Sequence, residues 1–151
     1  LRSIWSPFLP EAYWQSERSY PIGGTHIYLD VSGSMNAEMP LIVKLLNRLG
    51  RFIRRPFWAF SNVVAPAIIR DGRLVASTSG GTSMSCVLAH VASTRPPSAV
   101  VVTDGYIERL DRELVRSTAG TRLHAVVTRD GSPGLLAQAG IPFTQLGRLP
   151  Q

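Results

Sequence analysis

An uncharged run that ends in a carboxylate lies in the second half of the chain, where residues 99–105 read AVVVTDG. A short run dominated by valine is typical of a strand that is buried on both faces, as the strands of a parallel sheet are. The acid and the glycine after it mark the point where such a strand ends. The stretch therefore predicts a parallel sheet in which Asp104 stands at the carboxyl end of a central strand.

Strand and helix patterns alternate on both sides of this run. Strand patterns cover residues 26–29, 57–60, 63–69, 99–103, 122–128 and 142–146. Helix patterns cover residues 38–49, 84–92, 108–118 and 133–139, with a turn at 71–72 and a loop over 77–85. This alternation predicts an α/β fold, namely a Rossmann-like, doubly wound and mostly parallel sheet with helices on both faces.

The length and composition suit one domain. The chain has 151 residues, 44% of them hydrophobic, which is enough for one core. We expect residues 1–24, which contain several prolines and aromatic residues, to form an N-terminal arm or linker, and residues 25–151 to form the domain. Cys86 is the only cysteine, so no internal disulfide can form and a reducing, cytoplasmic location is expected. No apolar run reaches the roughly 18–20 residues that cross a bilayer.

The chain is basic, with a net charge of +6, and Lys44 is the only lysine among its 16 basic residues. Arginine binds carboxylates and phosphates through paired hydrogen bonds. The arginines at 48, 51, 54 and 55 therefore mark either a docking patch for acidic protein or nucleic acid, or a solvated helix end. The scattered histidines, the single cysteine and the lack of an H-E-x-x-H motif argue against a zinc hydrolase.

Oxygen-bearing side chains follow two predicted strands and occupy a loop between them. The first strand is followed by DVSGS at 30–34, the valine-rich strand by Asp104, and the loop carries Thr82. In a doubly wound sheet these two strands are neighbours, so Asp30 and Asp104 should lie side by side at the carboxyl edge. The candidate site residues are Asp30, Ser32, Ser34, Thr82 and Asp104.

Two neighbouring carboxylates repel each other unless a positive charge lies between them. These motifs contain no lysine, so a hard divalent cation is the expected partner. Mg²⁺ is the first expectation, with Mn²⁺ or Ca²⁺ as alternatives, because all three are bound mainly by oxygen ligands. The set contains no thiolate or imidazole, which argues against zinc and copper.

Several of these residues also have a purely structural interpretation. The serines at 32 and 34 would then cap a helix, as would Thr82 or the serine after it. Met35 would either line the rim of a site or pack in the core. Cys86 is expected to pack in the core rather than act as a nucleophile.

The pattern D-x-S-x-S after an apolar strand, a later loop threonine and T-D-G after a second apolar strand resembles the von Willebrand factor A (VWA) domain. The resemblance covers roughly residues 25–146. It implies the VWA fold, with the five candidate residues forming that family's metal-ion-dependent adhesion site. In this family an acidic side chain of a partner protein fills an open position on the metal. The compact chain and the lack of disulfides are similar to intracellular or bacterial members, which often work beside AAA+ ATPases of the MoxR type or within larger proteins.

The function implied by the resemblance is a non-enzymatic, Mg²⁺-dependent protein-interaction domain. One alternative is a metal-dependent phosphohydrolase, because an open metal position can also hold a nucleophilic water. No general base is evident in the motifs beyond the metal-associated acids themselves. The other alternative is a basic nucleic-acid-binding domain, although the aromatic and basic interleaving of an RNA-binding module is not present.

Overall fold

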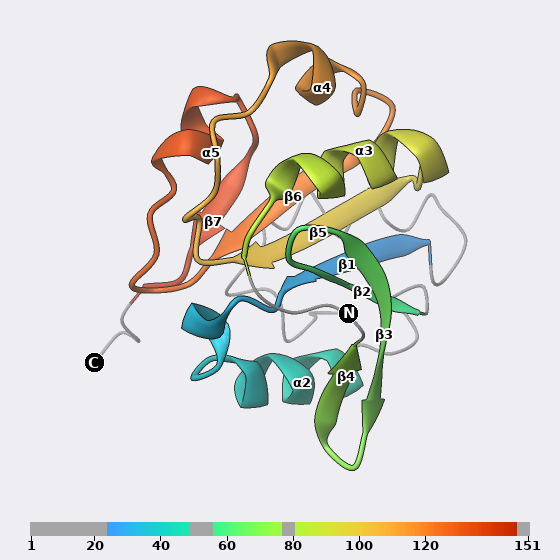
Figure 1. Ribbon diagram of the computed structural model, residues 1–151, viewed down its shortest axis with the longest axis vertical. Coiled ribbons are helices and arrows are strands. Elements are labelled where there is room, and N and C mark those ends of the chain that lie inside the picture. The colour runs from blue at the N-terminus through green and yellow to red at the C-terminus, as the bar shows by residue number, and fades with distance from the viewer. Residues whose placement is uncertain (1–23, 49–55, 77–80, 148–151) are drawn as a thin grey trace.

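The computed structural model describes residues 24–48, 56–76 and 81–147. Over these residues one sheet of seven strands crosses the molecule in the order β4-β3-β2-β1-β5-β6-β7, as Figure 1 shows. The pairs from β2 through β1, β5 and β6 to β7 are parallel, whereas β3 and β4 are antiparallel to their neighbours. The predicted α/β class and the mostly parallel, Rossmann-like sheet are confirmed.

The two central strands carry the ends on which the candidate site depends. β1 (Thr25–Asp30) and β5 (Ser98–Thr103) lie side by side and run parallel. Every residue of both strands is buried, which confirms that the valine run is a strand covered on both faces. Successive side chains of β5 point to opposite faces, so Val102 belongs to one core cluster and Val101 to the other.

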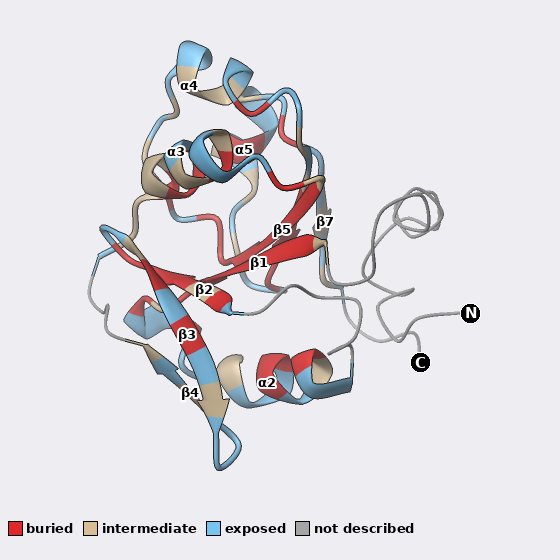
Figure 2. Cartoon of the chain, turned by 90° about the vertical axis from the view of Figure 1, so that its right-hand side faces the viewer, coloured by how far each residue is buried: buried red, intermediate tan, exposed pale blue. Residues whose placement is uncertain are grey.

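Helices cover both faces of the sheet, as Figure 2 shows. The 3-10 turn η1 (Gly33–Met35) leads from β1 to α2 (Met39–Arg48), whose apolar side chains join the core on one face. On the opposite face lie α3 (Met84–Thr94), the short α4 (Arg112–Arg116) and α5 (Gly134–Gln138). This arrangement is the doubly wound one that the sequence predicts.

Shorter strands complete the sheet on both sides of its centre. β2 (Phe57–Phe60) pairs with β1, and β3 (Val64–Arg70) and β4 (Arg73–Ala76) continue from it as antiparallel strands. On the other side β6 (Arg122–Val127) pairs with β5, and β7 (Phe143–Gln145) pairs with β6. The carboxyl ends of β1, β2, β5 and β6 therefore meet at one edge of the sheet.

The hairpin of β3 and β4 was only half predicted from the sequence. Asp71 and Gly72 connect the two strands with positive φ angles of 52° and 73°, as a two-residue hairpin loop requires. The sequence predicts this turn but not β4, because its four residues, RLVA, are too few to establish a strand pattern.

The helix predicted over residues 108–118 is much shorter than expected. The Asp111 carboxylate accepts a 2.8 Å hydrogen bond from the backbone N–H of Glu113, which caps α4 and fixes its start at Arg112. Of the predicted arm, only Gly24 lies among the described residues, and the arginines at 51, 54 and 55 also lie outside them. Within the described part of the chain, no helix is both long and apolar enough to span a bilayer.

Candidate functional site

Hydrogen bonds to both carboxylate oxygens hold the side chain of Asp30, the last residue of β1. Asp30 is fully buried. Its Oδ1 accepts a 2.9 Å hydrogen bond from the backbone N–H of Ser32, and its Oδ2 accepts a 2.7 Å bond from the Thr103 hydroxyl. The first bond is a local turn of the kind that aspartate favours, and the second joins the ends of the two central strands. The orientation of this carboxylate is therefore fixed by its neighbours.

Asp104 follows β5 directly and is also buried, with 5% of its surface exposed. Its Oδ1 accepts a 3.1 Å hydrogen bond from the backbone N–H of Tyr106, and its Oδ2 accepts a bond from the Ser34 hydroxyl. The Ser34 Oγ also lies 3.2 Å from the Oγ of Ser32. Because the Ser34 hydroxyl donates its proton to Asp104, the Ser32 hydroxyl must be the donor, and the Ser34 oxygen the acceptor, in the bond between the two serines.

Four of the five predicted site residues are thus brought together at the carboxyl edge of the sheet. We call them the Asp–Ser cluster, and its members are Asp30, Ser32, Ser34 and Asp104. Ser32 is nearly buried, whereas Ser34 is exposed, so the cluster opens to solvent on the side of Ser34. The predicted proximity of the β1 and β5 ends is confirmed by these contacts.

The local turn after β1 leaves both serine hydroxyls available to the cluster. Ser32 occupies the N-cap position of η1, but its side chain makes no capping hydrogen bond. The backbone N–H of Met35 bonds to the Ser32 carbonyl at 3.0 Å, and the Met35 side chain is fully buried. Met35 therefore packs in the core and anchors the turn, and the capping interpretation does not account for the Ser32 hydroxyl.

Thr82 lies in a neighbouring loop and is half-buried. No hydrogen bond within the described residues joins it to the Asp–Ser cluster. The next residue, Ser83, donates from its backbone N–H to the Ser61 carbonyl at 2.7 Å, which places the loop beside the end of β2. Ser83, and not Thr82, caps α3 by accepting a bond from the N–H of Cys86. Thr82 is left as a candidate without a capping role.

Two glycines let a second loop close tightly behind Asp104. The backbone N–H of Ser132 donates to the Asp104 carbonyl at 2.8 Å. A Cβ at Gly131 would lie 2.4 Å from that carbonyl oxygen, and one at Gly105, whose φ is 81°, would lie 2.0 Å from the Ser132 oxygen. Only glycine fits either position. The sequence identified Gly105 as the end of a strand, whereas it gave no sign of the role of Gly131.

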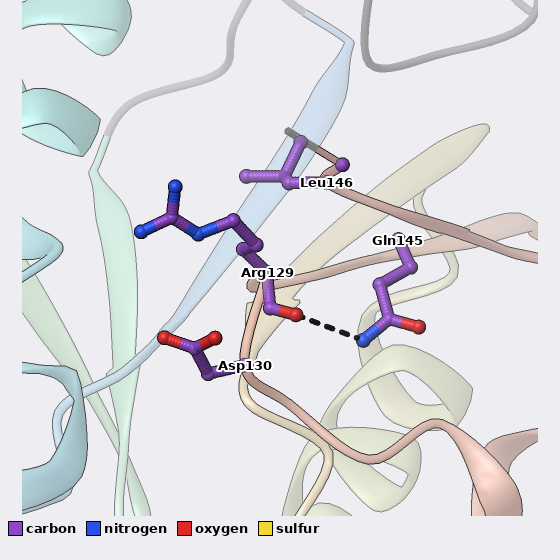
Figure 3. Close-up of a pocket in the computed structure, with 5 residues that line it drawn as sticks. Arg129, Asp130, Gln145 and Leu146 are labelled. Carbon is purple, nitrogen blue, oxygen red and sulfur yellow. Dashed lines mark hydrogen bonds between the residues drawn. The ribbon is translucent and has the colours of Figure 1, made fainter. Parts of the chain in front are cut away.

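An open pocket of about 670 Å³ adjoins this second loop, and Figure 3 shows its lining. The amide of Gln145 donates to the carbonyl oxygens of Gly131 at 2.9 Å and Arg129 at 3.4 Å, so β7 holds the loop in place. The charged residues that line the pocket, Arg129 and Asp130, are both exposed. None of the described lining residues belongs to the Asp–Ser cluster.

The charges and donor atoms of the Asp–Ser cluster fit a small, hard cation. The only ion pair among the described residues joins Arg116 and Glu113, so neither buried aspartate of the cluster has a cationic partner there. A buried charge without a partner is costly, and a divalent ion bound by oxygen atoms removes that cost. No group of three or more His, Cys, Asp or Glu side chains gathers in the described segments, so the hydroxyls of Ser32 and Ser34 would have to complete the ligand set.

Glu108, which the sequence pattern predicts at the start of a helix, instead binds the first turn of α3 through its carboxylate. Its carboxylate accepts hydrogen bonds from the backbone N–H of Met84 at 2.8 Å, that of Ser85 at 3.2 Å and the Ser83 hydroxyl at 3.0 Å. Partial burial acts to raise the pKa of Glu108, but the bonds from Met84 and Ser85 outweigh it and leave the pKa below its usual value. Glu108 thus ties the loop after β5 to the start of α3, directly beside Thr82.

The remaining reactive side chains lie away from the Asp–Ser cluster. Burial raises the pKa of the Cys86 thiol, which bonds to the Ser83 carbonyl at 2.9 Å and packs against the core. The Nδ1 atoms of His26 and His90 lie 3.2 Å and 2.7 Å from the Tyr28 hydroxyl. His124 lies 2.8 Å from the Thr144 hydroxyl on β7. Cys86 therefore has the packing role that was expected of it.

Fold and site together define an α/β domain with an oxygen-lined, carboxylate-rich cluster at the carboxyl edge of its parallel strands. In comparisons with known proteins, no family model and no curated protein matches the chain. The function is therefore argued from the cluster itself.

Proposed function

We propose that the Asp–Ser cluster, completed by Thr82, is a metal-ion-dependent adhesion site of the VWA type, and that the chain is a Mg²⁺-dependent protein-interaction domain. One observation carries this proposal. Two buried carboxylates lie at the two ends of one chain of hydrogen bonds, which runs through the backbone N–H of Ser32 and the hydroxyls of Ser32 and Ser34, and neither has a cationic partner among the described residues. All of its side-chain donor atoms are oxygen, which suits Mg²⁺.

In this proposal each residue of the cluster has a definite task. Asp30 and Asp104 supply the negative charge that attracts the ion, and their neighbours hold both carboxylates in place. Ser32, Ser34 and Thr82 supply neutral oxygens, so the site adds no negative charge beyond its two carboxylates, and the Mg²⁺ can still take a carboxylate from a partner. Ser34 is exposed, and a partner side chain can approach from its side.

The described contacts give no support to hydrolysis. A general base must lie within hydrogen-bond reach of the attacking water. The two aspartates of the cluster are assigned to the metal, and each of their oxygens also accepts a hydrogen bond from the protein. The three histidines bond elsewhere. No observation here favours the phosphohydrolase alternative over a binding domain.

The named kind of partner and the location follow only from the VWA resemblance. We extend the proposal to a partner that offers an Asp or Glu side chain to the metal, with an AAA+ ATPase of the MoxR type as one such partner in an intracellular setting. The carboxylate requirement is the part of this extension that rests on the chemistry of the cluster, because a metal ion bound mainly by neutral hydroxyls attracts an anion.

Thermal unfolding of the full chain with and without Mg²⁺ tests the proposal. We expect Mg²⁺ to raise the Tm of the wild type, because a ligand that binds only the folded state stabilises it. Asp30→Ala should abolish this increase. Asp111→Ala is the matched control, since it removes a carboxylate that caps α4, and it should retain the full response to Mg²⁺. A wild-type Tm that does not change with Mg²⁺ or Mn²⁺ would contradict the proposal.

A further inference from the structure

Residues of α4, of α5 and of the segment before α4 line a second hollow. Both helices lie on the face of the sheet that α3 also covers (Figure 1). The volume of the hollow is about 500 Å³. Three arginines and several apolar side chains line it, and we call it the arginine groove. The residues that matter here are Arg109, Arg112, Arg116, Leu110, Val115 and Leu135.

Two of the three arginines of the groove have no ion-pair partner among the described residues. Arg116 is paired with Glu113 at 3.3 Å, but both side chains are largely exposed, and an exposed pair of this kind contributes little to stability. Within the described residues, neither Arg109 nor Arg112 pairs with a carboxylate. Guanidinium groups around one hollow repel each other, so the groove favours an anionic occupant.

The floor of the groove is apolar. Leu110, Val115 and Leu135 are half-buried and pack against the core cluster that contains Val101. Val115 lies on α4 and Leu135 on α5, so the two short helices themselves supply part of this floor. An apolar side chain laid on this floor would be removed from water, which favours binding.

We propose that the arginine groove binds an acidic peptide segment of a partner protein. Carboxylates of the segment pair with Arg109 and Arg112, and one of its apolar side chains rests on the floor. Carboxylates match the fork of the guanidinium group, which favours such a segment. Among the described lining residues no Phe, Tyr or Trp offers nucleic-acid bases an aromatic ring to stack on. This inference does not depend on the metal site.

Fluorescence anisotropy with a short labelled peptide of glutamate and leucine tests the inference on the full chain at low salt. We expect the peptide to bind the wild type and to bind the R109E/R112E variant about tenfold more weakly or worse, because two charge-assisted contacts are reversed. Should the charge reversal impair folding, R109Q/R112Q removes the same contacts and should weaken binding in the same direction.

Two controls separate the groove from general basicity. R70E/R73E changes the net charge by the same amount at the exposed turn between β3 and β4, and it should leave binding nearly unchanged. A peptide in which serine replaces leucine should bind more weakly, because it cannot use the apolar floor. The inference is overturned by any of four results: no binding to the wild type, an equal loss in R70E/R73E, equal affinity for the serine peptide, or displacement of the peptide by a single-stranded oligonucleotide.

Discussion

The Thr103 hydroxyl donates a 2.7 Å hydrogen bond to Oδ2 of Asp30, across the boundary between the two central strands. The same hydroxyl oxygen accepts a 3.1 Å bond from the backbone N–H of Gly105. One buried side chain thus orients the carboxylate that ends β1 and also the turn that presents Asp104. The two acids of the cluster are coupled through Thr103, which is not itself a candidate ligand.

We expect Thr103→Val to destabilise the protein by about 1–3 kcal/mol, because it keeps the side-chain shape but removes a hydrogen bond to a buried carboxylate. Urea unfolding measures this loss. Thr121→Val is the control, since it removes only a bond to the neutral carbonyl of Pro96 and should cost about 1 kcal/mol or less. Equal costs for the two variants would show that Thr103 has no special role at Asp30.

Gly131→Ala should destabilise the fold by about 1–3 kcal/mol, because the added Cβ must displace packed backbone. That Cβ would lie 2.4 Å from the Asp104 carbonyl oxygen and 2.8 Å from a methyl group of Val127. Because relief of this clash moves Asp104, the variant should also show a smaller rise in Tm with Mg²⁺. Gly120→Ala, whose Cβ would meet nothing within 4 Å, should change neither quantity. A Gly131 variant that behaves like the Gly120 one would disprove the close fit.

Glu108→Ala tests whether the start of α3 matters to the proposed metal site. Glu108 holds the N–H groups of Met84 and Ser85, two and three residues beyond Thr82. If Thr82 is a ligand, loss of this support should weaken Mg²⁺ binding on the order of 10-fold or more, as the loss of residues that orient metal ligands does. Asp111→Ala is the control. It also removes a helix cap, which should lower the free energy of unfolding by about 1 kcal/mol, and it should leave the Mg²⁺ affinity unchanged.

Calorimetric titration of Mg²⁺ measures these affinities, and the double variant with Thr82→Ala identifies the route. Two residues that act through one contact give less than additive effects. We therefore expect Glu108→Ala to weaken binding little further once Thr82 is already alanine. Fully additive effects would exclude Thr82 as the residue through which Glu108 acts.

The lowered pKa of Glu108 predicts a dependence of stability on pH. A carboxylate whose pKa is lower in the folded than in the unfolded state stabilises the fold above its unfolded pKa, which is about 4.3 for glutamate. This contribution is lost as the pH falls through the folded pKa. Glu108→Gln should therefore lose less stability than the wild type when urea unfolding is measured from pH 5 downwards, and parallel curves would contradict the assignment.

The sequence was sufficient to predict the centre of the fold. The valine run identified β5 as a strand buried on both faces. The alternation of strands and helices predicted a doubly wound sheet, in which β1 lies beside β5. From that adjacency alone, Asp30 and Asp104 were expected at one edge, where hydrogen bonds now join Asp104 to Ser34 and Ser34 to Ser32. These features could be predicted because they follow from strand order and not from side-chain detail.

Features that depend on contacts distant in sequence were not predictable. The sequence pattern predicts that a helix starts at Glu108. Its carboxylate instead accepts a hydrogen bond from the start of α3, and α4 begins only at Arg112. Thr103 reads as the end of a β-strand, and nothing local reveals that its hydroxyl bonds to a residue 73 positions away. For Thr82 the sequence gives a loop position only, and its role as a ligand stays a prediction.

Calorimetric titration of Mg²⁺ into the full chain measures whether the Asp–Ser cluster binds the ion. We expect one saturable site per chain, with clearly weaker binding in Ser34→Ala. Ser34 is exposed, so its replacement removes an oxygen of the site with little effect on the core. Ser132→Ala, at another exposed serine, should bind Mg²⁺ as the wild type does. A wild type that binds no Mg²⁺, or a Ser34 variant with undiminished affinity, would contradict the account.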